Sequence, residues 1–256
     1  MLIGGIDVGA AFVKMVVMED GKVVTKGIVK ATLEQEEDIR KVIEETLQTA
    51  NIKENQIKKL GSTGVGRNLV KGADVYVTDV TADAAGVHFL NREVKTVIDI
   101  GGEESRAIKV GSDGTVVNFA VNDKCAAGAG AFVEAMARAM QLTIEEFAEA
   151  SLKSTQKIPI NAQCAIFAES EVVSLVSDEV PREDICRAVH DGISERISSM
   201  AKRVMIEEPV GVIGGAAHNK GLIASLNEAL GLNTIVFPDP EYVSAIGAAL
   251  LASRSE

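Results

Sequence analysis

The feature that most constrains this 256-residue chain is a short pattern that occurs twice. Residues 4–9 read GGIDVG, so an apolar segment ends in Asp7 and then turns at Gly9. Residues 98–102 read IDIGG, which repeats the pattern 92 positions later with Asp99 and Gly101. Each copy is followed by two further short strand-like runs and then by a helical pattern. A unit of three strands and a helix therefore occurs twice, which predicts a duplicated α/β fold.

Alternating apolar runs and turn residues predict the individual elements. The strands expected are Leu2–Val8, Phe12–Met18, Lys22–Val29, Ile57–Thr63, Asp74–Thr78, Thr96–Gly101, Ser105–Val110, Thr115–Val121, Val210–Ile213 and Thr234–Phe237, the last two as buried parallel strands. The helices expected are one around Ile39–Leu47, Ala82–Phe89, Gly128–Met140, one opened by the capping box Thr143–Glu146, Ala165–Val176, a long one after Pro181, Lys220–Leu230 and Val243–Ser253.

The point at which the pattern restarts predicts the domain organisation. We expect one lobe over residues 1–93, with residues 243–256 packing back on it, and a second lobe over residues 94–242. A chain of this length suits two modest domains as well as one large one.

Charge and composition exclude several classes of protein. The net charge of −11 argues against nucleic-acid binding, which needs clustered Lys and Arg. No apolar run reaches the 18 or more residues of a membrane span, and the N-terminus lacks the basic segment of a secretory signal. Three cysteines cannot form a disulfide framework in a chain this long. We therefore expect a cytoplasmic protein without membrane or nucleic-acid partners.

Both acidic turns have a chemical use beyond a simple hairpin. Small residues let backbone N–H groups approach phosphate oxygens, and a carboxylate holds Mg²⁺ directly or through water. Two such turns would bind a triphosphate, with Lys14 adding positive charge. The alternative, a plain Asp-Gly hairpin, is weakened because both copies occupy the same place in a repeated unit.

A third glycine turn completes a recognisable set. Residues 211–217 read GVIGGAA, which is a strand running into a Gly-Gly turn. In this order the three turns resemble the two phosphate motifs and the adenosine motif of the acetate/sugar kinase–Hsp70–actin superfamily. The resemblance implies two ribonuclease-H-like lobes with an ATP cleft between them.

Two of the cysteines stand at expected helix starts, where a thiolate is favoured. Cys125 lies in a glycine-rich string and Cys164 precedes the helix expected at Ala165, whereas Cys186 lies inside the long helix and is interpreted as a small core residue. Two thiolates are too few for a four-iron cluster, which needs four. A symmetric dimer would complete that number, while inert thiols remain the alternative.

The cysteine strings NDKCAAGAGAF and CAIFAESEVVSL resemble those of the activator ATPases of 2-hydroxyacyl-CoA dehydratases and the ATPase subunits of benzoyl-CoA reductase. GIDVG, STGVGR, TVIDIGG, GGAAHNKG and EYVSAIGAAL support the match. The resemblance implies a homodimer that shares one [4Fe–4S] cluster, held by Cys125 and Cys164 of each protomer, with ATP and Mg²⁺ bound to each. ATP hydrolysis to ADP would accompany transfer of one low-potential electron, from ferredoxin or flavodoxin, to an iron–sulfur dehydratase or reductase.

The same resemblance assigns roles to individual residues. Asp7, Asp99 and Glu103 are expected to act in hydrolysis, and the nucleotide contacts are expected at Gly9, Ala10, Ala11, Phe12, Val13, Lys14, Gly101, Gly102, Gly214, Gly215, Ala216 and Glu241.

The chain departs from the family pattern at several of these positions. Ala10 and Ala11 replace the usual Ser and Thr, so backbone donors remain but hydroxyl contacts are lost. Residues 103–106 read EESR in place of Gln-Asp-x-Lys, and a Gln that would position the attacking water becomes Glu103. The remaining departures are Val65 for Tyr, and Asp79 and Asp83 for a Glu/His pair.

Two other functions remain open from the sequence. A small-molecule kinase of the same superfamily needs a substrate pocket, for which the chain has little additional length. In a non-catalytic, actin-like scaffold, Ala10, Ala11 and Glu103 would be present because the protein no longer hydrolyses ATP. His88, His190 and His218 share no spacing and are interpreted as structural or surface groups.

Overall fold

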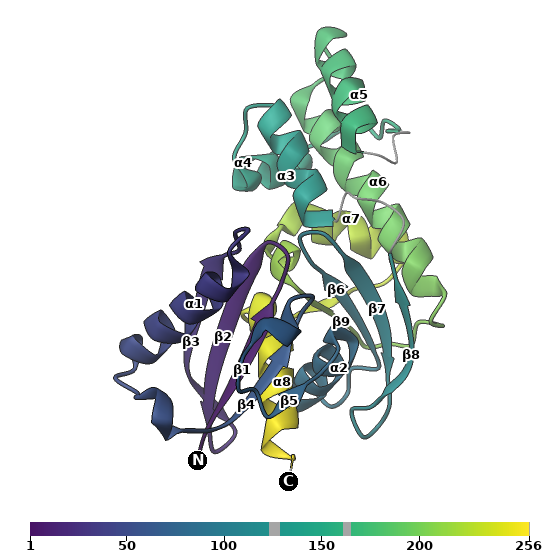
Figure 1. Ribbon diagram of the computed structural model, residues 1–256. Coiled ribbons are helices and arrows are strands. Elements are labelled where there is room, and N and C mark those ends of the chain that lie inside the picture. Colours follow the sequence, from purple (N-terminus) through teal and green to yellow (C-terminus); the bar gives the residue numbers. More distant parts are fainter. Residues whose placement is uncertain (123–128, 161–164, 256) are drawn as a thin grey trace. The chain divides into compact units, whose positions relative to one another are not determined.

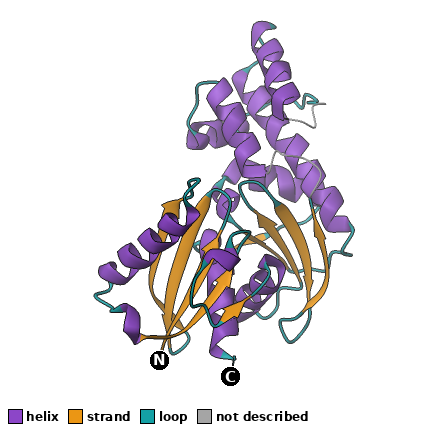
Figure 2. Ribbon diagram, viewed as in Figure 1, coloured by secondary structure: helices purple, strands orange, loops and turns teal. Residues whose placement is uncertain are grey.

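The computed structural model of the protein describes residues 1–122, 129–160 and 165–255 (Figure 1). In this part of the chain the strands form two five-stranded sheets, drawn in orange in Figure 2. The chain divides into two compact units. The first unit comprises Met1–Val97, Ile108–Asn118 and Pro238–Glu256, and the second comprises Ile98–Ala107 and Phe119–Phe237. The domain boundary at residues 93 and 94 stays a prediction.

The first sheet has the strand order β3-β2-β1-β4-β5. β1, β2 and β3 form an antiparallel meander because short turns join them, and β4 pairs with β1 in parallel. Asp20 and Gly21 both have positive φ angles of 48° and 76°, which suits the two-residue turn between β2 and β3. The bounds are β1 Leu2–Val8, β2 Phe12–Glu19, β3 Lys22–Lys30, β4 Ile57–Thr63 and β5 Val75–Tyr76.

Alternate side chains of the first sheet enter two different cores. On one face Val13, Met15 and Val17 of β2 pack with Ile39 and Val42 of helix α1, Gln35–Thr49. On the other face neighbouring β2 side chains pack with α8, Val243–Ser253. Figure 1 shows α1 and the yellow α8 on opposite sides of this sheet.

Glycines bring α8 unusually close to its neighbours. A Cβ at Gly5 of β1 would overlap the carbonyl oxygen of Ala245, and one at Gly61 of β4 would overlap that of Ala248. On the other side of α8 lies α2, Asp79–Leu90. A Cβ at Gly247 of α8 would overlap a carbonyl oxygen of α2, and the backbones therefore touch directly. This contact requires glycine, since any side chain would separate the elements.

The second sheet repeats the strand order of the first. Its order is β10-β9-β6-β7-β8, so β6, β7, β8, β9 and β10 take the places of β1 to β5. The bounds are β6 Thr96–Ile100, β7 Ser105–Val110, β8 Val116–Val121, β9 Val210–Ile213 and β10 Ile235–Val236. The duplication predicted from the two acidic turns is thus present in the topology.

The helices of the second unit are concentrated between β8 and β9. The long helix α6 places Ile185, Val189, Ile193, Ile197 and Met200 in the core, as its sequence spacing predicts. The bounds are α3 Ala129–Ala139, α4 Ile144–Ser151, α5 Ala165–Ser177, α6 Arg182–Lys202 and α7 Lys220–Leu230. Four short 3₁₀ helices in the described ranges are Glu54–Gln56, Arg67–Leu69, Gly215–His218 and Pro240–Tyr242. Over the described residues, the apolar stretches of the helices fall short of what a bilayer crossing requires.

One burial prediction is wrong. The sequence predicts a buried strand over Thr234–Phe237, but Ile235 and Val236 of β10 are 39% and 38% exposed. β10 pairs in parallel with β9, as expected, yet it stands at the end of the sheet. An edge strand has a neighbour on one side only, so its side chains are less well covered.

The predicted capping box of α4 gives a direct stability test. Thr143 Oγ1 accepts a hydrogen bond from Glu146 N at 3.1 Å, and Glu146 Oε2 accepts one from Thr143 N at 2.9 Å. We expect Thr143→Ala to lower the free energy of unfolding by about 1 kcal/mol. Thr143→Ser keeps the hydroxyl, and serine caps helices at least as well as threonine, so the free energy of unfolding from urea denaturation should change little. Equal losses in both variants would contradict a capping role.

Candidate functional site

The first acidic turn follows β1 and pairs its carboxylate with a lysine of β2. Asp7 and Lys14 are register partners, and Lys14 Nζ donates to Asp7 Oδ2 at 2.7 Å. Both side chains are largely buried, with exposures of 8% and 15%. The turn between them is tight, because Gly9 N donates to the carbonyl oxygen of Phe12 at 3.1 Å. A buried carboxylate and its cation are therefore held at the end of the strand.

The second acidic turn has the same construction at β6 and β7. Arg106 Nη1 donates to Asp99 Oδ2 at 2.6 Å, and its Nη2 donates to Glu104 Oε2 at 2.8 Å. The Asp99 and Arg106 side chains are 6% and 11% exposed. Gly101 N donates to the carbonyl oxygen of Glu104 at 2.9 Å, which closes the turn. The planar guanidinium of Arg106 thus donates hydrogen bonds to two carboxylates at once.

Arg106 is a site residue that the sequence predictions do not include. It stands 92 positions after Lys14, the same separation as between Asp7 and Asp99. In the sequence it is evident only as a departure from a family lysine. The shared spacing of aspartate and cation is the signal that identifies it.

A glycine with positive φ lies against each aspartate. Gly64, after β4, has a φ of 91°, and its Cβ would lie 2.6 Å from Asp7 Oδ1. Gly214, after β9, has a φ of 89°, and its Cβ would overlap Asp99 Oδ1. Since both positions need the left-handed region and have no space for a side chain, only glycine fits. Gly64 is absent from the predicted site because a turn glycine alone is a common feature.

The other predicted nucleotide residues occupy different environments. Phe12 is 40% exposed, whereas the Val13 side chain is fully buried in the core against α1 and cannot contact a ligand. A Cβ at Gly215 would meet nothing within 4 Å, and Glu103 is exposed. Ala10 is exposed, while Ala11, Gly102, Ala216 and Glu241 are half-buried.

The two aspartates suit a hard divalent cation. Each uses Oδ2 for its own cationic side chain. Carboxylate oxygens are the ligands that Mg²⁺ prefers, usually together with waters and substrate phosphates. The donor set is therefore chemically compatible with Mg²⁺ at either turn.

The cysteines predicted to bind iron, Cys125 and Cys164, lie outside the described residues. Cys186 is fully buried in α6, and burial raises the pKa of its thiol to about 12, so it stays protonated at neutral pH. This matches its interpretation as a core residue. Across the described ranges, His, Cys, Asp and Glu side chains form no group of three or more that could hold a metal ion.

The start of α3 is joined to the second acidic turn. Gly130 N donates to Gly101 O at 3.1 Å, and Ala131 N donates to Gly102 O at 2.9 Å. A Cβ at Gly130 would lie 3.1 Å from both Gly101 O and the Gly102 Cα. The first turn of α3 therefore rests directly on the backbone of the acidic turn.

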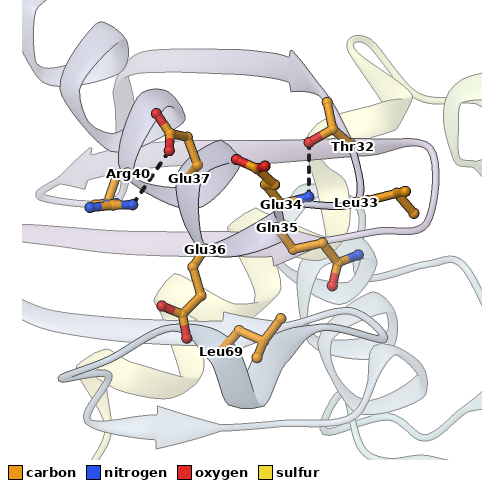
Figure 3. Close-up of a pocket in the computed structure, with 8 residues that line it drawn as sticks. All are labelled: Thr32, Leu33, Glu34, Gln35, Glu36, Glu37, Arg40 and Leu69. Atoms are coloured by element: carbon orange, nitrogen blue, oxygen red, sulfur yellow. Dashed lines mark hydrogen bonds and ion pairs between the residues drawn. The ribbon is translucent and has the colours of Figure 1, made fainter.

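An open pocket of the first unit lies apart from these residues. It is lined at the start of α1 by residues 32–37 and Arg40, together with Leu69 (Figure 3). Glu34 N donates to Thr32 Oγ1 at 3.1 Å, and Arg40 lies 3.6 Å from Glu37. Three glutamates line this pocket, which makes it unsuited to a phosphate. None of the predicted site residues lies in it.

Comparison with known proteins gives matches over nearly the whole chain. The family model described as the BadF/BadG/BcrA/BcrD ATPase family matches residues 5–252. The activator of lactoyl-CoA dehydratase from Anaerotignum propionicum is 36% identical over 97% of this chain and 96% of its own length. The (R)-2-hydroxyglutaryl-CoA dehydratase activating ATPase from Acidaminococcus fermentans is 38% identical over 98% and 96%. A subunit of benzoyl-CoA reductase from Thauera aromatica is 29% identical over 96% and 91%.

Solved structures agree with these matches. Component A of the A. fermentans dehydratase superposes with a TM-score of 0.94 at 37% identity, covering 98% of this chain and 97% of that one. The activator of 2-hydroxyisocaproyl-CoA dehydratase from Clostridium difficile, solved with bound ADPNP, gives 0.93 at 32% identity over 98% and 94%. A ROK family glucokinase from Streptomyces griseus gives 0.64 at 15% identity over 99% and 100%, which concerns the fold alone. The predicted fold class, a two-lobed ATPase fold of the actin and Hsp70 type, is confirmed.

Proposed function

This chain belongs to the BadF/BadG/BcrA/BcrD ATPase family, and we propose that its ATP hydrolysis drives one low-potential electron to a partner iron–sulfur enzyme. The observation that carries the proposal is the coincidence of two sets of residues in one chain. The paired acidic turns supply the nucleotide site, and the strings around Cys125 and Cys164 supply four thiols in a dimer. Relatives that match over almost the full length are named as dehydratase activators.

The nucleotide is held by backbone donors and by the two aspartates. Backbone N–H groups of residues 9–11 and 101–102 bind phosphate oxygens, so the loss of hydroxyls at Ala10 and Ala11 leaves these donors in place. Asp7 and Asp99 hold Mg²⁺ directly or through water. Glu103, which is exposed beside the second turn, orients the attacking water. The open space beside Gly215 leaves room for the ribose and base.

In a homodimer, one shared [4Fe–4S] cluster is held by Cys125 and Cys164 of both protomers. When bound, the cluster supplies a one-electron carrier whose thiolate ligands come from both protomers. The loop over residues 154–156, which precedes the undescribed residues 161–164, is bonded to α6. Asp184 Oδ1 accepts hydrogen bonds from Ser154 Oγ at 2.8 Å, Thr155 N at 2.9 Å and Gln156 N at 3.1 Å.

The same framework provides the coupling between nucleotide and cluster. Residues 101 and 102 contact the phosphates, and their carbonyl oxygens accept from the first turn of α3. A change in the turn on hydrolysis is therefore transmitted to the helix that follows Cys125. Coupling of this kind requires two arrangements of the element that nucleotide and cluster favour to different extents.

The names of the relatives support a dehydratase or reductase as the partner, whereas the electron donor is proposed from the family resemblance alone. The acceptor is an iron–sulfur enzyme of the 2-hydroxyacyl-CoA dehydratase or benzoyl-CoA reductase type, and the donor is ferredoxin or flavodoxin. Because the relatives include both dehydratase activators and a reductase subunit, the acceptor itself is to be identified by co-purification.

The test is anaerobic purification with an iron count and electron paramagnetic resonance, with and without MgATP. We expect about four iron atoms per dimer and a resonance that changes with nucleotide. Cys125→Ser should lose both, whereas Cys186→Ala should keep both, because Cys186 is a buried core thiol. A folded Cys125→Ser protein that retains its iron, or a wild type that binds none after reconstitution, would contradict the proposal.

A further inference from the structure

A buried hydrogen-bonded chain in the second unit runs through His190 of α6. The His190 side chain is fully buried, and burial lowers its pKa to about 3, with Arg187 as a lesser cause. The imidazole is therefore neutral near pH 7. A neutral ring has one donor and one acceptor nitrogen, so the partners of the two nitrogens determine which tautomer is present.

The neighbours of His190 assign that tautomer. Ser151 Oγ donates to Ala148 O at 2.9 Å, so at its 2.9 Å contact with His190 Nδ1 the hydroxyl is the acceptor. Nδ1 consequently carries the hydrogen. The other nitrogen, Nε2, accepts from Asn219 Nδ2 at 3.1 Å.

Asn219 connects this chain to the third glycine turn. Its Oδ1 accepts from Leu222 N at 2.9 Å and thereby caps α7. Its backbone N donates to Ala216 O at 3.0 Å and thereby ends the turn that begins at Gly214. A single orientation of the Asn219 side-chain amide directs Oδ1 to α7 and Nδ2 to His190. The position of the turn is thus fixed at Asn219 by a side chain from α6.

Close packing keeps the ring from shifting. Phe147 of α4 meets it edge-on, with ring centroids 5.2 Å apart and an interplanar angle of 83°. A Cβ at Gly221 would overlap Ser151 Oγ and would lie 2.7 Å from His190 Cε1. Since α4 and α7 both pack against the imidazole, its Nε2 is a rigid acceptor for Asn219.

We propose that His190 is the positioning residue for the turn over residues 214–219 and thereby sets the affinity for a nucleoside diphosphate. The inference rests on the proposed function, in which this turn lies against the ribose and base. A turn held in its binding geometry before the ligand arrives loses less freedom on binding, which strengthens affinity. His190 acts through Asn219 and touches no ligand itself.

Two substitutions of the same ring separate positioning from general stability. His190→Gln places an amide oxygen near the Nε2 position and keeps the acceptor for Asn219. His190→Asn places its amide near Nδ1 and keeps only the bond to Ser151. By calorimetric titration of the full chain with MgADP we expect His190→Asn to raise Kd by up to about tenfold, the change that corresponds to the loss of one hydrogen bond. His190→Gln should bind MgADP close to the wild-type value. In ATP hydrolysis His190→Asn should raise KM and leave kcat unchanged.

A third variant covers the case in which the ring substitutions destabilise the fold. Asn219→Ser keeps a helix cap but is too short to reach His190. It should weaken MgADP binding as His190→Asn does, and the two together should weaken it no further. Equal affinities for His190→Asn and His190→Gln, or additive losses in the double variant, would overturn the positioning role. A wild type that binds no MgADP would instead overturn the proposed function.

Discussion

The Gly5→Ala substitution is expected to lower the free energy of unfolding by about 3 kcal/mol, because it forces a methyl group into a closed backbone contact. The added Cβ would overlap Ala245 O and would lie 2.7 Å from Ala249 N, both backbone atoms of α8. A helix backbone cannot rotate away as a side chain can, so β1 and α8 must separate. The midpoint of urea denaturation, followed by circular dichroism, measures the loss.

The matched control is the same substitution at Gly192 in α6. There a Cβ would meet only Ile160 O, at 3.9 Å, an ordinary contact. Alanine is the better helix former, so Gly192→Ala should stabilise the protein by about 0.5–1 kcal/mol. Opposite signs for the two variants are the expected result. A Gly5→Ala protein as stable as the wild type would mean that β1 and α8 are not in direct contact.

Removing the cation of the second acidic turn is expected to have the largest effect on hydrolysis. Arg106→Met leaves the buried Asp99 and the nearby Glu104 without their shared guanidinium. Breaking a buried pair from one side costs about 3–5 kcal/mol of stability. Loss of a preorganised electrostatic contact typically reduces kcat by about 10²–10³. ATP turnover and urea denaturation of the same preparation separate the two effects.

A second substitution shows whether Arg106 acts through Asp99. Asp99→Asn removes the charge that Arg106 offsets, so the stability lost in Arg106→Met should be smaller when both changes are combined. Arg106→Lys keeps the charge but loses the fork that bonds two carboxylates at once, and we expect an intermediate stability. Additive stability losses for the Arg106 and Asp99 changes would show that the pair does not interact.

Much of the fold is predictable because its elements are local patterns. β1, β4, β7, β9, α7 and α8 have the bounds expected from apolar runs, turns and caps. The duplication is readable from Asp7 and Asp99, since the same acidic turn recurs at the same place in two similar sets of strands. The burial of the α6 stripe also follows from a single helical period.

What the sequence does not reveal depends on contacts between distant segments. The 92-residue offset relates Arg106 to Lys14, but the bonds from its guanidinium to Asp99 and Glu104 are visible only in the structure. Gly64 and Gly214 appear as ordinary turn glycines until the aspartate beside each is located. His190 has no distinguishing spacing in the sequence, because the positions of Ser151 and Asn219 relative to it depend on the packing of three helices. The exposure of β10 depends on its place at the sheet edge, which a four-residue apolar run does not specify.

The equal strand order of the two sheets has a consequence for how this protein arose. Between β3 and β4 the first copy carries the single long helix α1, whereas between β8 and β9 the second copy carries α3, α4, α5 and α6. Cys125 and Cys164 both fall inside that enlarged connection. A duplication followed by one insertion at a single crossover would produce this arrangement, with the two acidic turns in the part that both copies share and both proposed cluster cysteines in the inserted part.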